Sequence, residues 1–163
     1  ETVINEYDEN ELSDIFFYYG EERNSRKIAN SIVEFRKKKK IDSTKMLSDI
    51  IQKINKYKFK HPATRVFQAL RIVINEELNE LEEALKISLE ILTKNAKIVI
   101  VAFHSLEDKI VKNFFKKNEC KNFNEDHKNV FRIITKKPIT PSSEEIRINS
   151  RSKSAKLRVA EKI

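Results

Sequence analysis

The sequence predicts an α/β fold in which a helical unit precedes part of a sheet. Three observations indicate this fold: helical spacing of apolar residues through the first third, a short apolar run at 97–103, and two alternating runs at 130–136 and 155–163. After the helical unit, the order helix, strand, helix, strand, strand is typical of the closing half of an α/β sheet.

The net charge and the composition indicate which kinds of molecule the chain binds. The chain has 163 residues and a formal net charge of +8, with a pI of about 9.5. This balance favours a polyanion such as nucleic acid, although lysine-rich proteins can also simply be soluble. No run approaches the roughly 18 apolar residues of a membrane span, and no signal peptide is visible. Cys120 is the single cysteine, so no internal disulfide forms, and a reducing cytoplasm fits best.

The chain is unusually poor in glycine. It has one glycine, Gly20, where average usage would give about eleven. Residue 1 is glutamate and the one methionine is Met46. We therefore expect a fragment, a processed chain, or a sequence stripped of disordered segments.

The first third is expected to form three helices. The stretch 9–20 has apolar residues at helical spacing and ends at Gly20, a natural C′ residue. The stretch 21–39 has acids first and bases last, as the helix dipole prefers. The third helix, 42–54, has Asp42 or Ser43 as its N-cap. Together they predict a small bundle ending near residue 59.

The remaining elements follow in order. Helical spacing continues over 61–92, which is long for one helix, so a kink or break is expected between Asn75 and Asn79. The run 97–103 is almost uniformly apolar, which predicts a strand covered on both faces in a parallel sheet. A helix follows it, then a polar loop, a strand at 130–136, a short helix near Thr140, and the last strand.

The junction "FHSLED" at 103–108 has two readings. Ser105 as N-cap with Asp108 at N3 is close to a capping box, and Glu107 complements the helix dipole. His104 is not needed for that cap, and it lies at the carboxyl end of a strand, where open α/β sheets bind ligands. The residues alone leave a structural and a functional role for His104 equally open.

Two further segments are candidates for binding RNA. In "HPATRVFQALR", Arg65, Gln68 and Arg71 share one helix side near His61, which is either a phosphate-binding edge or a solvated face. In "RINSRSKSAKLR", basic residues alternate with small hydroxyl residues, a composition that phosphate contacts favour. The run "RKKKK" at 36–40 is more typical of a solvated helix end. His127 and Cys120 lack the spacing of metal ligands, so no metal is expected.

Five motifs in this order resemble one family. They are "YGEER" with "RKIA" after it, "HPATRVFQALRIVINEEL", "FHSLEDKIVKNFF", "TKKPITPSSEEI" and "SRSKSAKLRVAEK". Together they resemble the bacterial 16S rRNA cytosine-N4 methyltransferase family (RsmH/MraW). The resemblance implies a class I, Rossmann-like methyltransferase sheet with an inserted helical bundle, S-adenosyl-L-methionine as cofactor, and 16S rRNA of the small ribosomal subunit as substrate.

The resemblance also implies domains and site residues. Residues 1–58 would be the helical insertion and 59–163 the C-terminal half of the catalytic domain. The target cytidine would lie in the decoding region. The residues expected beside it are His104, Ser105 and Asp108, and those expected on the RNA are His61, Arg65, Gln68, Arg71, Arg151, Lys153 and Lys156.

The chain departs from the family pattern at the cofactor. The glycine-rich loop and the early acidic residues that hold it are absent, and the turn before the apolar run is "TKNAK" without glycine. We therefore expect the chain alone to be inactive. The alternatives are a basic, non-enzymatic nucleic-acid-binding helical module and a scaffold that keeps the fold without catalysis. The sequence leaves the oligomeric state open, including a homodimer.

Overall fold

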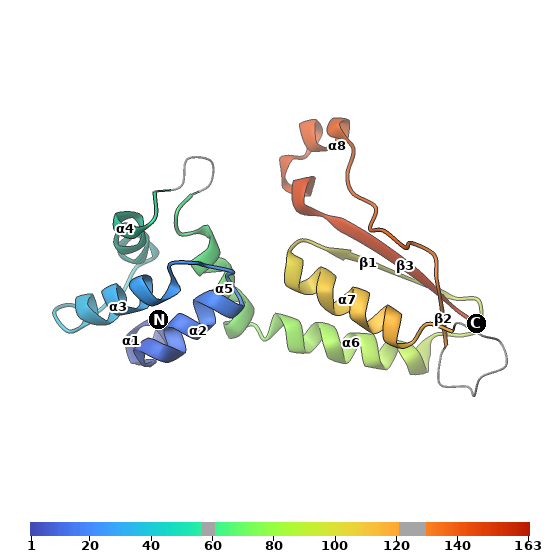
Figure 1. The fold of residues 1–163 in the computed structure, drawn as a ribbon, viewed down its shortest axis with the longest axis horizontal. Helices are drawn as coiled ribbons and strands as arrows, with labels where there is room; N and C mark the ends of the chain where they lie inside the picture. Colours follow the sequence, from blue (N-terminus) through green and yellow to red (C-terminus); the bar gives the residue numbers. More distant parts are fainter. Residues whose placement is uncertain (57–60, 121–129) are drawn as a thin grey trace. The chain divides into compact units, whose positions relative to one another are not determined.

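The computed structural model describes residues 1–56, 61–120 and 130–163. It divides into two compact units, Glu1–Glu77 and Leu78–Ile163, which are described separately. The first contains α1 (Thr2–Glu6), α2 (Glu9–Tyr18), α3 (Ser25–Arg36), α4 (Thr44–Ile54) and α5 (Thr64–Ile74) (Figure 1). The second contains most of α6 (Glu77–Ile91), then β1 (Lys97–Ala102), α7 (Ser105–Lys117), β2 (Phe131–Ile133), α8 (Ser143–Ile148), η1 (Ser150–Ser154) and β3 (Lys156–Lys162).

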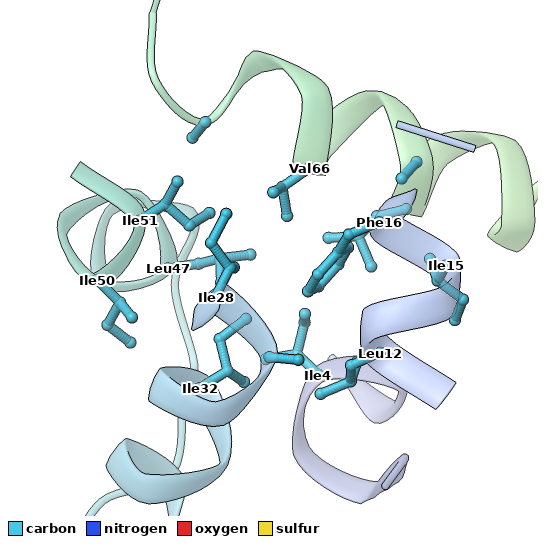
Figure 2. Packing of buried hydrophobic residues seen from close by; sticks show 14 of the residues in the cluster. Ile4, Leu12, Ile15, Phe16, Ile28, Ile32, Leu47, Ile50, Ile51 and Val66 are labelled. Atoms are coloured by element: carbon cyan, nitrogen blue, oxygen red, sulfur yellow. The ribbon is translucent and has the colours of Figure 1, made fainter. Parts of the chain in front are cut away.

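The helical unit has one apolar core. Figure 2 shows Phe16 of α2, Ile28 of α3 and Val66 of α5 converging on its centre, and all three are fully buried. The three expected helices are confirmed, with Ser43 as the N-cap of α4. The short helix α1 was not foreseen, although it contributes Ile4 to this core.

Helix α5 packs with the helical unit. Its buried residues, such as Val66 and Leu70, belong to the same core as α2, α3 and α4. The sequence predicts a domain boundary between residues 58 and 59, outside the described residues, and so places α5 in the second domain. The compact units instead separate after Glu77, next to the expected helix break, which occurs at Asn75 and Glu76. Glu76 has a φ of 51°, which ends α5.

The single glycine is required by a close approach of two backbones. A Cβ on Gly20 would lie 2.6 Å from the carbonyl oxygen of Arg65 in α5 and 2.7 Å from that of Phe16. Gly20 follows α2 as expected, but its φ is not positive; Glu21 has the left-handed conformation, with a φ of 50°. Any side chain at position 20 would therefore push α2 away from α5.

The second unit is a three-stranded antiparallel sheet covered by helices on one face. The last strand, β3, lies between β1 and β2 and pairs antiparallel with both. Leu85 of α6 and Val111 and Phe115 of α7 pack against this sheet around Phe131 and Ala160 (Figure 1).

The opposite face of the sheet is apolar and open. Val99 and Val101 of β1 are 56% and 46% exposed, and they pair with Val159 and Leu157 of β3. The expectation that 97–103 is a parallel strand covered on both faces is therefore wrong for this chain. The reason is that its one paired neighbour among the described residues, β3, is antiparallel, and no described element covers the outer face.

Candidate functional site

The junction between β1 and α7 is closed by His104 and Glu107. His104 is the N-cap of α7, and its Nδ1 accepts a hydrogen bond from the Glu107 amide at 3.4 Å. The Glu107 carboxylate accepts from the amides of Phe103 and His104 at 2.7 and 3.2 Å. The expected capping box is thus present but shifted by one residue. The assignment of Ser105 as N-cap with Asp108 at N3 is wrong, because the helix begins at Ser105 itself.

The capping bond fixes how His104 can act. Because Nδ1 accepts a hydrogen bond from an amide N–H, a neutral imidazole has its own proton on Nε2. The Nε2 atom is buried, has no hydrogen-bond partner among the described residues, and lies 3.3 Å from the Glu107 carboxylate. The His104 side chain is only 8% exposed. The His104 imidazole is therefore held in one orientation, shielded from solvent, just after the carboxyl end of β1. The neighbouring Ser105 is exposed.

Asp108 forms an ion-pair network that joins α7 to β3. Its carboxylate accepts from the Arg158 guanidinium at 2.7 and 3.3 Å and from Lys156 Nζ at 3.2 Å. Asp108 and Arg158 are both buried. Burial raises the pKa of Asp108, but the hydrogen bonds from Arg158 and Lys156 outweigh burial and hold the pKa below its usual range. Asp108 is therefore ionised and fully engaged at neutral pH.

The predicted RNA-binding residues of α5 lie in the other unit. The Arg65 guanidinium donates to the Glu21 carbonyl oxygen at 3.0 Å, and Gln68 donates to the Tyr19 carbonyl oxygen at 3.4 Å. These bonds attach α5 to the turn after α2. Arg71 is held bidentately by Glu77 at 2.7 and 3.0 Å.

His61 precedes α5 and contacts Gln52 of α4. His61 Nε2 lies 3.3 Å from the Gln52 amide nitrogen, and His61 Nδ1 accepts from the Ala63 amide. The sequence prediction that these side chains share one polar side of α5 agrees with the exposure of His61 and the partial exposure of Arg65 and Gln68. Their role toward RNA stays a prediction.

The basic C-terminal stretch is split between two roles. Arg151 and Lys153 are exposed on η1, a 3-10 turn that the sequence analysis did not foresee. Lys156 instead contacts Asp108, although 37% of its side chain stays exposed. The structure therefore leaves two of the three predicted phosphate contacts open to solvent and brings the third to the α7–β3 network.

Arg158 is the residue that the site analysis missed. It had been grouped with the basic stretch, but it is 7% exposed and is the main partner of Asp108. The alternation of β3 contained the signal, because Arg158 and the core residue Ala160 lie two positions apart and share a face. His127, which had been weighed as a metal ligand, lies outside the described residues.

The comparisons with known proteins agree over the whole chain. A family model described as the MraW methylase family matches residues 1–163. A protein named ribosomal RNA small subunit methyltransferase H from Sulfurihydrogenibium sp. is 50% identical over 99% of this chain and 54% of its own length. Proteins of the same name from Hydrogenobaculum sp. and Rickettsia typhi are 51% and 48% identical over 97% and 100% of the chain. The chain spans about half the length of the curated relatives it matches.

Proposed function

The chain belongs to the MraW methylase family, and on that premise we propose that the whole protein methylates N4 of a cytidine in the decoding region of 16S rRNA. The donor would be S-adenosyl-L-methionine, and the reaction would take place in the cytoplasm. This proposal rests on sequence similarity: the chain is 50% and 51% identical to two relatives named ribosomal RNA small subunit methyltransferase H. Because the chain spans about half of those relatives, the activity is proposed for the whole protein and not for this chain alone.

The open side of the sheet supports the proposal of a larger, class I sheet. The exposed Val99 and Val101 and their half-buried partners Leu157 and Val159 form an apolar face of the sheet. The outer edge of β1 has no paired strand among the described residues. An apolar central-type strand with a free edge is suited to accept a further strand, and the apolar face to accept helices. We propose that the remaining half of the catalytic domain supplies both.

Two features of the described residues argue against a complete methyl-donor site among them. Such a site needs a flexible backbone loop and free amides, whereas Gly20 is packed against the α5 backbone. The amides of Phe103, His104 and Glu107 at the start of α7 are already bonded by His104 and Glu107. We propose that the methyl donor is held mainly by the rest of the protein and that this chain acts on the substrate side.

The chemistry of the target amine indicates what these residues have to do. The lone pair of cytosine N4 is delocalised into the ring, so the base must be turned out of its stack and held in line with the methyl group. We propose that His104, oriented by the capping bond on Nδ1, shapes the wall of the pocket that receives the base. Ser105 is exposed beside it and would contact the same nucleotide.

Both carboxylates of "FHSLED" already have structural partners. Glu107 accepts two backbone amides, and Asp108 is bonded to Arg158 and Lys156. We therefore assign Asp108 a positioning role, in which it fixes α7 against β3 behind His104, and assign no general base. Alignment of the base would then supply most of the acceleration from this side of the site.

A methyl-transfer assay tests the proposal. The intact protein should transfer a labelled methyl group from S-adenosyl-L-methionine to 16S rRNA or to small subunits, with the label recovered in RNA. A protein that binds RNA but transfers no label would support the non-enzymatic binding module instead. A protein that keeps the fold without binding RNA or transferring label would be the degenerate scaffold.

A further inference from the structure

The helical unit contains a basic cavity with exposed aromatic rings. The cavity has a volume of about 390 Å³ and lies between the second half of α2 and the start of α3. Phe17 and Tyr18 line one side, and Arg23, Arg26 and Lys27 line the other. None of these residues belongs to the candidate sites at α5, at the start of α7 or at η1.

The two rings are displayed to solvent. Phe17 and Tyr18 are 54% and 61% exposed, because α2 uses its other face, with Leu12 and Phe16, for the core. Their centroids lie 5.2 Å apart at an interplanar angle of 82°, so each ring keeps a face that the other does not cover. Exposed adjacent aromatic rings are uncommon on a globular surface, and they provide a platform on which a nucleic-acid base can stack.

The opposite wall concentrates positive charge. Arg23, Arg26 and Lys27 are exposed, and no ion pair joins any of them to another described residue. The first turn of α3 has no acidic residue, and no side chain caps it. Arg26 and Lys27 therefore stand at the positive end of the helix dipole, and the buried carboxylate of Glu22 just before the helix accepts from the Asn24 amide. Asp14 is the one acidic residue of the lining.

The walls of the cavity are held in place by buried polar bonds. The hydroxyls of Ser13 and Ser25 lie 3.3 Å apart and join α2 to α3. The Asn24 amide donates to Glu22 at 2.9 Å, and the Asn24 side chain donates to Asn55 at 2.8 Å. The cavity is thus formed before any ligand arrives, which lowers the entropic cost of binding.

We infer that this cavity binds one nucleotide of a single-stranded RNA segment, with the base stacked on Phe17 or Tyr18 and the phosphate against Arg23, Arg26 and Lys27. The inference rests on the proposed function for the choice of RNA as the anion, and it adds a second contact surface on the helical unit. Single strands fit better than duplexes because only an unpaired base can leave its stack to reach the rings. The carboxylate of Asp14 offers an acceptor to the amino group of such a base.

Binding of a short fluorescein-labelled single-stranded RNA to the whole 163-residue chain tests the inference by fluorescence anisotropy. Tyr18→Ala should weaken binding about tenfold, as expected for the loss of one stacked base, and Tyr18→Phe should restore it. Arg26→Glu with Lys27→Glu should weaken binding further. The same double variant should flatten the slope of log affinity against log salt by roughly 0.7 for each phosphate that the protein no longer neutralises.

The matched control lies at the other end of the same helix. Lys38→Glu with Lys39→Glu makes the same charge change at exposed positions after α3 and should leave the affinity for RNA within about twofold of the wild-type value. Circular dichroism would verify that each variant is folded. Equal effects of both charge reversals, equal affinity for duplex RNA or polyglutamate, or no binding by the wild-type chain would each overturn the inference. Methyl transfer by the intact protein would still stand in those cases, so failure of this site and failure of the proposed function are distinguishable.

Discussion

Replacing His104 separates its capping role from its proposed role at the substrate. His104→Ala removes one capping bond to Glu107, which at 3.4 Å is long, while the two bonds that the Glu107 carboxylate accepts remain. Loss of an N-cap costs about 0.5–2 kcal/mol, and the long bond places this case near the low end. We therefore expect the free energy of unfolding to fall by about 0.5–1 kcal/mol.

Two variants of the same junction sharpen the test. His104→Asn supplies a preferred N-cap without an imidazole, so it should restore stability in urea unfolding of the chain. Ser105→Ala changes a first-turn residue that is not the cap, so it should cost less than His104→Ala. In the intact protein, both His104→Ala and His104→Asn should lower methyl transfer to RNA, although only His104→Ala is destabilised.

The outcome for His104→Asn decides between the two roles. If this variant is stable and transfers methyl groups at the wild-type rate, His104 is a cap and nothing more. A stable His104→Asn variant with a lowered rate would show that the imidazole itself acts on the substrate. Should His104→Ala cost more than about 3 kcal/mol, the capping argument fails, because a loss that large indicates a core residue.

Three further predictions follow from the ion pairs, the basic stretch and the proposed position of the cofactor site. Asp108→Asn should cost about 3–5 kcal/mol in urea unfolding, because it leaves Arg158 buried without its carboxylate partner. Because folding lowers the pKa of Asp108, its carboxylate stabilises the fold above the unfolded pKa of about 3.9, and this stabilisation is lost as the pH falls through the lower folded value. A difference in unfolding free energy between wild type and Asp108→Asn that does not narrow in acid would contradict this. Replacing Arg151 and Lys153 by alanine should weaken binding to every RNA sequence and flatten the slope of log affinity against log salt by roughly 0.7 per lost phosphate contact. An unchanged slope would mean that these side chains are only solvated. Lys156 is not replaced, because it also contacts Asp108. Calorimetric titration of the chain with S-adenosyl-L-methionine should give no tight binding, and a tight complex would contradict the absence of the cofactor site.

The fold was predictable where local chemistry decides it. Helices α2 to α5, the break at Asn75 and Glu76, and the strand character of β2 and β3 follow from apolar periodicity and turn residues, whereas α1 was not foreseen. The covering of β1 was not predictable in this way. Its apolar composition is typical of a strand buried on both faces, but which faces are covered depends on tertiary packing that the local pattern does not specify.

The bonding at the candidate site was only partly predictable from the sequence. The junction at 103–108 is polar and closely bonded, but the cap is His104, because a histidine Nδ1 can replace the usual hydroxyl or carboxylate oxygen. The partner of Asp108 lies fifty positions away on β3, a distance that local reasoning does not cover. The aromatic run at 16–19 contained a further signal, because one face of a helix can bury only some of four successive rings.

Nucleoside analysis of methylated RNA tests the central claim most directly. The intact protein would be incubated with small subunits that lack the modification and with S-adenosyl-L-methionine, and the digested 16S rRNA would be separated and weighed by mass spectrometry. The account predicts one new product, N4-methylcytidine, whose amount falls in the His104→Asn protein. A methyl group on any other atom, or on no nucleoside at all, would contradict it.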